Sequence, residues 1–395
     1  MSGVRTQRRT ERMERRRAAR HGVMAVAASA VVAVGTVTGL VSAAGDRDEN
    51  DTARPKATTS PLTVPLPARP SPSPSPATVT ATPSSPTASQ KASTKAAPRP
   101  PARRETPTTG ARLYRHPDSQ VLDWVRANRN DPRRPLIESR IAAQPAAVWF
   151  AVHNPGEVTG QVRAVTSGAA AAGRVPVLVP YAIPGRDCGG ASQGGAPDLA
   201  SYDRWVEEFA AGLGGDPVIV VLEPDSISQS DCLSAGVRAA RFASLARAGR
   251  TLKAANPQAK VYFDAGHSGW NPAGKQAALL RAAGAATASD GVFTNVSNFH
   301  RTADEVRYAR QVLAALGGPE PLGAVIDTSR NGNGAPAAGE WCDPPGRAIG
   351  RAPTAETGEA GIDAYLWVKL PGESDGCKGA AGSFTPDYAY DLATG

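Results

Sequence analysis

The sequence predicts an α/β fold built on one distorted parallel (β/α) barrel of about seven strands. Seven short runs rich in Val, Ile and aromatic residues recur between residues 147 and 369, and their apolar residues are continuous rather than alternating. Strands show such continuous apolar runs when helices cover both faces of a parallel sheet. Stretches with helical patterning separate the runs, which is the order of elements that a barrel of βα units requires.

The expected strands follow one another at fairly even spacing. They are residues 147–151, 175–181, 217–223, 259–264, 291–296, 321–327 and 362–369. Between them, residues 201–213 and 235–255 are typical of helices, and the second ends at Asn256-Pro257 because a proline disfavours helix at the residue before it. An open doubly wound sheet is the alternative, but no glycine-rich phosphate loop follows the first run.

The first 45 residues predict export from the cytoplasm. An Arg-rich head precedes an uncharged apolar run, residues 22–45. Val41-Ser42-Ala43 has the form of a signal-peptide cleavage site, but the run is also long enough to anchor the chain in a membrane. Under either interpretation the rest of the chain is extracellular, and it is either secreted or anchored to the outer face of the cell membrane.

Residues 46–110 form a linker between the export segment and the folded region, residues 111–395. The linker is rich in Pro, Ser, Thr and Ala and contains the repeat SPSPSP. It contains no aromatic residue and cannot bury enough apolar surface to offset the ordering of its backbone. We therefore expect a disordered spacer in front of a single catalytic domain.

The charge distribution argues against a nucleic-acid partner. The chain has a net charge of +8, of which residues 1–20 carry +6 and residues 46–110 carry +4, so residues 111–395 hold about −2. A surface that follows phosphates needs clustered Lys and Arg in the folded region. We therefore expect no nucleic-acid binding. We also expect the protein to be a monomer.

Four cysteines lie in the folded region: Cys188, Cys232, Cys342 and Cys377. An even number outside the cytosol indicates two disulfides, for which four cysteines allow three pairings. A zinc site is the alternative, but the cysteines are far apart in the sequence and show no CxxC spacing.

Acidic residues follow four of the expected strands. They are Asp187, then Glu223 and Asp225, then Asp264, and finally Glu373 and Asp375. In an α/β barrel the carboxyl ends of the strands converge on one mouth, where active sites lie. Crowded carboxylates raise one another's pKa, so that some keep a proton while others stay ionised. Hydrolysis of glycosidic bonds uses such a pair of acid and base carboxylates.

Each acid also has a purely structural interpretation. Asp225 and Asp264 could cap a following helix, and Asp187 could pair with its neighbour Arg186. Four such coincidences at strand ends are harder to explain than one, which favours a shared site.

Aromatic and polar residues near the same strand ends indicate a saccharide ligand. Trp149, Trp270 and Trp341 lie at strand ends or in loops, where an indole ring can stack on the C–H face of a sugar. Tryptophan is otherwise mostly a core residue. Side chains that could bind hydroxyl groups are His267, Asn298, Lys369 and Glu373. His267 has an alternative role as a capping or structural histidine.

Six motifs in sequence order carry a family resemblance. They are VPYAIPGRDCGG (179–190), IVVLEPDSIS (219–228), YFDAGHSGW (262–270), DTSRNGNG (327–334), EWCDPPGRAIG (340–350) and LWVKLPGESDGC (366–377). Together they resemble glycoside hydrolase family 6, which contains endoglucanases and cellobiohydrolases, and the pattern is closest to actinobacterial-type endoglucanases. The resemblance extends over essentially all of residues 111–395. It implies a distorted barrel and inverting hydrolysis of β-1,4-glucan, with no metal or organic cofactor.

The resemblance also implies roles for matching residues. Asp225 resembles the general acid and Asp375 the proposed base, while Asp187 would tune the pKa of Asp225 and Asp264 would support the site electrostatically. Tyr181 matches a tyrosine close to the distorted sugar. The implied substrate-binding positions are Trp149, His267, Trp270, Asn298, Trp341, Lys369 and Glu373, and the implied disulfides are Cys188–Cys232 and Cys342–Cys377.

Loop lengths favour endo action. Trp341 and Asp375 are only 34 positions apart and the loop 188–202 is short, whereas exo-enzymes of the family carry long insertions that roof the site. One departure from the family pattern is Gln193, beside Ser192, which is the candidate for a serine that positions water. The alternatives are exo action of the cellobiohydrolase type and non-catalytic glucan binding, and the second would require a missing acid. We expect the substrate to be cellulose or a related β-glucan.

Overall fold

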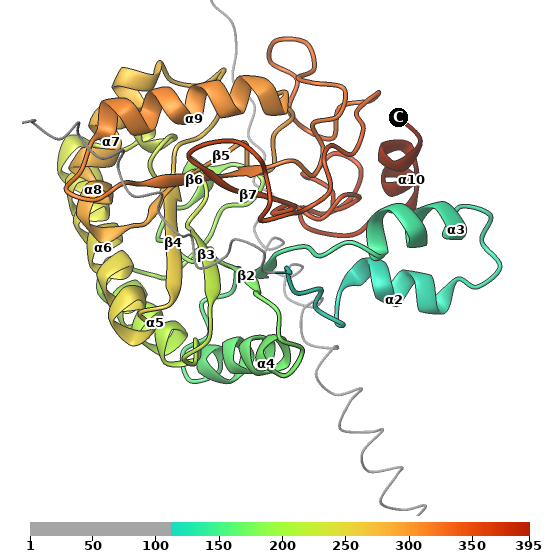
Figure 1. Ribbon diagram of the computed structural model, residues 1–395, viewed down its shortest axis with the longest axis horizontal. Coiled ribbons are helices and arrows are strands. Elements are labelled where there is room, and N and C mark those ends of the chain that lie inside the picture. Colours follow the sequence, from blue (N-terminus) through green and yellow to red (C-terminus); the bar gives the residue numbers. More distant parts are fainter. Residues whose placement is uncertain (1–111) are drawn as a thin grey trace, which may run out of the picture. The chain divides into compact units, whose positions relative to one another are not determined.

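The computed structural model describes residues 112–395, so the predicted export segment and linker lie outside the described residues. Strands form the centre of the described region (Figure 1), and seven of them are hydrogen-bonded into one sheet. They are β1 (Val148–Phe150), β2 (Val177–Pro180), β3 (Val218–Leu222), β4 (Ala259–Asp264), β5 (Gly291–Thr294), β6 (Gly323–Asp327) and β7 (Ile362–Leu366). Each strand lies inside one of the predicted runs, so all seven predictions are confirmed.

The strands pair in the order in which they occur in the chain. Every pairing from β1–β2 to β6–β7 is parallel. A doubly wound sheet would instead reverse its strand order at a switch point, so that alternative is wrong. The two edges of the sheet approach each other, because the backbone N–H of Ala147, before β1, donates to the carbonyl of Trp367, after β7, at 2.9 Å. The sheet is therefore a distorted barrel.

Helices surround the strands (Figure 1). They are α4 (Val158–Ala171), α5 (Leu199–Ala211), α6 (Ala235–Ala255), α7 (Ala273–Ala282), α8 (Ala285–Ala288) and α9 (Thr302–Leu316). The predicted helices 201–213 and 235–255 are confirmed as α5 and α6. Within the described part of the chain, none of the helices has the length and apolar character needed to cross a membrane.

Two apolar cores lie on the two faces of the sheet. Along β3, Val218, Val220 and Leu222 belong to the core between sheet and helices, whereas Ile219 and Val221 belong to the core inside the barrel. Successive strand residues point to opposite faces, so a strand covered on both sides needs an apolar residue at every position. This burial explains why the sequence runs are continuous.

A third core joins the two ends of the described chain. It is formed by α2 (Gln120–Ala127), α3 (Arg134–Ile137), the π-helical turn Glu138–Ala142 and α10 (Pro386–Thr394), which lie together beside the barrel in Figure 1. Trp367 and Leu370, which follow β7, are buried in the same cluster. The first and last segments therefore support the loop that follows β7.

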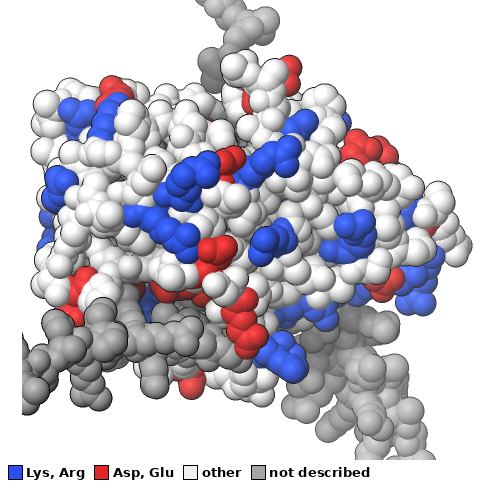
Figure 2. Space-filling view, turned by 45° about the horizontal axis from the view of Figure 1, so that its top comes forward, with Lys and Arg blue, Asp and Glu red and all other residues white. Residues whose placement is uncertain are grey.

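Charged side chains are dispersed over the visible surface. Figure 2 shows Lys and Arg spread among acidic and uncharged residues on the face that it presents.

Candidate active site

The carboxyl ends of the parallel strands form one rim of the barrel, which we call the mouth. Asp187 follows β2, Asp225 follows β3, Asp264 is the last residue of β4 and Asp375 follows β7. The charges of Asp264 and Asp187 act on the carboxyl of Asp225, which places these three acids close together. The structure thus brings the predicted acids to the mouth.

Asp225 lies in a strained turn directly after β3. Its φ is 69° and that of Glu223 is 49°, a left-handed conformation that residues with a side chain rarely adopt. Burial raises the pKa of Asp225 well above its usual range, and the charges of Asp264 and Asp187 raise it further. A carboxyl group that keeps its proton in this way can act as a general acid.

The structural interpretation of Asp225 as a helix cap is wrong. The short 3-10 helix that follows, Ser230–Cys232, begins after Gln229, and the next α-helix, α6, is capped by Ser234, whose side chain accepts from the backbone N–H of Val237 at 3.4 Å. Asp225 is therefore free of that role.

Asp264 has a structural role as well as an electrostatic one. Its buried carboxylate accepts backbone N–H groups from Ile227 at 3.0 Å, Ser228 at 2.7 Å and Gly266 at 2.9 Å. Burial raises its pKa, although these hydrogen bonds act in the opposite direction. Asp264 thus holds the turn that carries Asp225, rather than a helix terminus.

The loop after β2 places Asp187 without the ion pair to Arg186 that was its alternative structural interpretation. The guanidinium of Arg186 donates to the carbonyls of Ala151 at 2.6 Å and Ser192 at 2.7 Å and also to that of Tyr181. The Asp187 carboxylate accepts the backbone N–H of Ser192 at 2.7 Å, and its φ is 56°. No ion pair between these neighbours occurs within residues 112–395.

Tyr181 and Trp149 form an aromatic wall beside the acids. Their rings lie edge to face with centroids 5.2 Å apart, and Trp149 Nε1 donates to the carbonyl of Val368 at 2.7 Å. Burial raises the pKa of Tyr181, and the charges of Asp225 and Asp187 raise it further. The phenol of Tyr181 therefore stays protonated and can donate a hydrogen bond near Asp225.

Asp375 lies between two cations. Arg330 Nη1 contacts its Oδ2 at 2.8 Å, and Lys369 Nζ lies 3.6 Å from its Oδ1. Both the Arg330 and the Asp375 side chains are buried. Because Oδ2 also accepts the backbone N–H of Asp343 at 3.2 Å, Oδ1 is the less occupied oxygen.

Both disulfides implied by the resemblance are bonded in the structure. Cys188–Cys232 joins the loop after β2 to the segment before α6, and Cys342–Cys377 ties the β6–β7 connection to the loop of Asp375. Disulfides fit an extracellular protein.

Three further acids hold the loops of the mouth: Asp343 and Asp327 were not predicted as site residues, and Glu223 was predicted only as an acid at a strand end. Asp343 accepts four groups of the segment 374–378, including the backbone N–H of Asp375 at 2.7 Å. Asp327, the last residue of β6, accepts backbone N–H groups of Ser297, Ser329, Val368 and Lys369.

Glu223 is the third of these acids. It accepts the N–H groups of Ala182 at 2.9 Å and Ile183 at 3.0 Å, and burial raises its pKa to about 7. Glu223 and Asp327 end predicted strands, so an acid at a strand end was the available signal. The neighbouring loops that these acids hold were not visible in the sequence.

Apart from Trp149, which is the middle residue of β1, the predicted substrate-binding residues occupy loops of the same rim. His267 and Trp270 follow β4 with ring centroids 5.3 Å apart, and Asn298 follows β5. Lys369 and Glu373 follow β7, and burial raises the pKa of Glu373 to about 7 although nearby Lys369 lowers it. Trp341 stands apart: it is 56% exposed in the β6–β7 connection, and none of the ring contacts among the described residues involves it.

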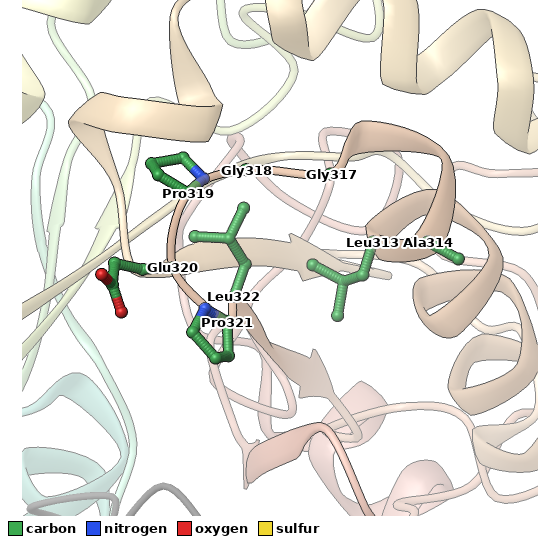
Figure 3. A pocket seen from close by; sticks show the side chains of 8 residues that line it. All are labelled: Leu313, Ala314, Gly317, Gly318, Pro319, Glu320, Pro321 and Leu322. Atoms are coloured by element: carbon green, nitrogen blue, oxygen red, sulfur yellow. The ribbon is translucent and has the colours of Figure 1, made fainter. Parts of the chain in front are cut away.

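A surface hollow of about 410 Å³ lies away from the mouth. It is lined by the end of α9 and the connection to β6, and Figure 3 labels its residues from Leu313 to Leu322. This connection enters β6 at its amino end. The hollow is therefore at the rim opposite the acids and plays no part in their site.

Comparisons with known proteins agree with this geometry. The family model described as Glycosyl hydrolases family 6 matches residues 108–394. Endoglucanase 1 of Streptomyces sp. (strain KSM-9) is 55% identical over 284 residues, which cover 72% of this chain and 78% of that protein. Endoglucanase A of Thermobispora bispora is 52% identical over 282 residues, which cover 71% of this chain and 61% of that protein.

A solved structure and more distant relatives also match this chain. The endoglucanase Cel6 from Mycobacterium tuberculosis, solved with a methyl-cellobiosyl-4-deoxy-4-thio-β-D-cellobioside, is 40% identical with a TM-score of 0.68, and the match covers 73% of this chain and 98% of that one. Probable cellobiohydrolases of Aspergillus species match at 29–30% identity. With a family match over nearly all of the described residues, this chain belongs to glycosyl hydrolases family 6 and is a glycosidase.

Proposed function

We propose that the protein is an endoglucanase that hydrolyses internal β-1,4-glucosidic bonds of cellulose or a related β-glucan with inversion. The observation that carries the proposal is the position of Asp225. Its carboxyl lies at the mouth beside two further acids, Asp187 and Asp264, and its pKa is raised well above the usual range. An acid held protonated beside a polysaccharide site is what bond cleavage by general-acid catalysis requires.

In this proposal Asp225 donates its proton to the glycosidic oxygen as the bond to the anomeric carbon breaks. Asp187 and Asp264 raise the pKa of Asp225 through their charge, so that the proton is present at working pH. Tyr181 stands beside the same acid and donates a hydrogen bond to the sugar at the reacting subsite.

Asp375 is the proposed base that activates the attacking water. Its Oδ1 is the less occupied oxygen, which leaves a lone pair for the water. An inverting enzyme needs its two carboxyl groups roughly 6.5–9.5 Å apart so that a water fits between base and sugar. Asp225 follows β3 and Asp375 follows β7, and other strands separate these two in both directions around the barrel, which supports such a spacing.

Endo action is supported by two observations. The chain is 52–55% identical to two endoglucanases but only 29–30% identical to the cellobiohydrolases. Trp341, a proposed stacking platform, is 56% exposed rather than covered by a loop. The remaining proposed contacts to the glucan chain come from Trp149, His267, Trp270, Asn298, Lys369 and Glu373. The export segment, residues 22–45, delivers this domain to the outside of the cell, where its substrate is.

Hydrolysis of cellohexaose tests the proposal. Proton NMR of the first products should show the α-anomer at the new reducing ends, because inversion at a β-linkage creates it. Product lengths should show cleavage at more than one internal bond. A β-anomer formed first would contradict inversion, and cellobiose as almost the only product would contradict endo action.

A further inference from the structure

We propose that His300 is a positioning residue that fixes His267 in the tautomer carrying its proton on Nε2, and that this N–H donates to a sugar hydroxyl. The acceptor hydroxyl rests on the proposed function, whereas the tautomer depends only on the protein. His300 follows β5 and was absent from the predicted site residues. The contacts of the His267 ring, of its loop and of His300 support this proposal.

The backbone on either side of His267 is already fixed. The N–H of Gly266 donates to Asp264 Oδ1 at 2.9 Å, and the N–H of Ser268 donates to Glu305 Oε1 at 2.9 Å. Both acceptors are buried carboxylates. These hydrogen bonds hold the backbone of the loop after β4 in place. His267 can then change its conformation only by rotation of its side chain.

The Nδ1 atom of His267 accepts a hydrogen bond. The donor is the backbone N–H of Gly269, at 3.1 Å. A neutral imidazole carries its single proton on the nitrogen that does not accept, so the proton belongs on Nε2. Burial, together with the charge of His300, lowers the pKa of His267 to about 3, which keeps the ring neutral.

The Nε2 atom of His267 is available to a ligand. Within residues 112–395 it has no hydrogen-bond partner. It is also not one of the fully buried polar atoms without a partner, so the atom is exposed. It therefore reaches solvent at the mouth, beside Trp270, whose ring centroid is 5.3 Å from that of His267. A neutral N–H donor beside an indole ring suits a sugar, which offers a hydroxyl acceptor next to an apolar C–H face.

His300 supplies the wall that prevents rotation. Its ring stacks on that of His267 with centroids 4.2 Å apart and planes inclined by 19°. The backbone of His300 is itself anchored, because its N–H donates to Asn295 Oδ1 at 3.0 Å and its carbonyl accepts from Asn331 Nδ2 at 2.9 Å. The backbone of His300 is therefore held by side chains of the segments that follow β5 and β6.

Gly269 makes this stacking possible. A Cβ at this position would lie 2.6 Å from His300 Cε1 and 3.4 Å from His267 Nδ1. Only glycine both donates its N–H to Nδ1 and leaves room for the His300 ring. Gly269 thus contributes both to the hydrogen bond at His267 Nδ1 and to the stacking of the His300 ring.

Two variants separate stacking from other effects of His300. His300→Phe keeps a flat ring, whereas His300→Ala removes it. In ¹⁵N-histidine-labelled full-length protein, His267 should give the signals of a neutral Nε2–H imidazole down to about pH 4 in the wild type and in His300→Phe. In His300→Ala the His267 ring should lose this fixed tautomer and titrate above about pH 5.

Kinetics on cellotetraose provide the second readout. His300→Ala should raise KM about fivefold, the loss of one neutral hydrogen bond, with kcat changed less than about twofold. His300→Phe should restore the wild-type KM. Gly269→Ala, which displaces the His300 ring without removing it, should reproduce the spectrum and the KM of His300→Ala.

The proposal is overturned if the His267 signals of His300→Ala match those of the wild type, or if His300→Phe loses as much affinity as His300→Ala. A wild-type protein that shows the expected signals but does not cleave cellotetraose would overturn the proposed function and the sugar acceptor. In that case the fixed tautomer of His267 would still be supported.

Discussion

Asp264 accepts a hydrogen bond from the backbone N–H of Ser228 at 2.7 Å, so the last residue of β4 holds the turn that follows β3. Asp225 lies three residues before Ser228, with a left-handed φ of 69°. The charge of Asp264 also contributes to the raised pKa of Asp225. One carboxylate therefore fixes the backbone of the proposed general acid and helps to keep its proton.

Substituting Asp264 by Asn should separate these two roles. The amide retains an acceptor oxygen but removes the charge, so the pKa of Asp225 should fall. Activity requires the protonated form of Asp225 and is lost as pH rises through its pKa. The alkaline limb of the kcat/KM profile on cellotetraose should therefore move to lower pH.

The matched variant for this test is Asp264→Ala. It leaves three backbone N–H groups of Ile227, Ser228 and Gly266 without their acceptor, which should cost about 2–4 kcal/mol of unfolding free energy. If the alkaline limb of Asp264→Asn stays where it is in the wild type, Asp264 has no influence on Asp225.

Asp225→Ala should lose activity according to the leaving group. With cellotetraose the leaving oxygen needs a proton, so kcat should fall by about 10²–10⁴. With a dinitrophenyl cellobioside the leaving group departs without one, and the loss should be much smaller. Asp123→Ala, at an exposed ion pair with Arg126, is the control and should retain full activity on both substrates. Equal losses on the two substrates would argue against Asp225 as the acid.

Arg330 should be essential to stability because it neutralises Asp375 inside the protein. The two side chains are 0% and 8% exposed, and Arg330→Met would leave the carboxylate without its closest cation. Breaking a buried pair on one side costs about 3–5 kcal/mol, to be measured by urea unfolding. Arg126→Met breaks an exposed pair and should cost less than about 1 kcal/mol. Similar small losses in both variants would contradict a buried ion pair.

The pH dependence of stability should reveal Glu223. Its pKa in the folded protein is about 7, above its ordinary 4.5, because the buried group resists ionisation. The folded protein therefore keeps the proton longer than the unfolded chain, and stability is lost as pH rises from 4.5 through 7.

The comparison for Glu223 is Glu223→Gln, which cannot ionise but keeps an acceptor for Ala182 or Ile183. Between pH 4 and pH 8 the wild type should lose about 3 kcal/mol of unfolding free energy relative to this variant. Glu138→Gln, at an exposed ion pair with Arg134, should follow the wild-type curve. Parallel curves for wild type and Glu223→Gln would show that Glu223 ionises normally.

The strands could be predicted because their burial is uniform. In β3, Ile219 and Val221 face the interior of the barrel while Val218, Val220 and Leu222 face the helices, so no polar position interrupts the run. The acids could be located for a related reason. Parallel strands bring their carboxyl ends to one rim, whatever the loops do.

Contacts between loops could not be predicted in this way. Asp343, Asp327 and Glu223 hold backbone groups of loops that are distant in sequence, and their partners depend on which loops the fold places side by side. At Arg186 the structural alternative of an ion pair with Asp187 is wrong, because the guanidinium binds three carbonyls instead. The core that joins α2 and α3 to α10 could not be predicted for the same reason, because its members come from both ends of the described chain.

The most direct test of the account compares viscosity loss with reducing-sugar release on carboxymethylcellulose, for residues 111–395 and the Asp225→Ala variant, both folded with their disulfides formed. The account predicts a rapid fall in viscosity while few reducing ends have appeared, and almost no fall with the variant. Slow sugar release at nearly constant viscosity would contradict endo action. An undiminished fall in viscosity with Asp225→Ala would contradict the role of Asp225, which is the central claim.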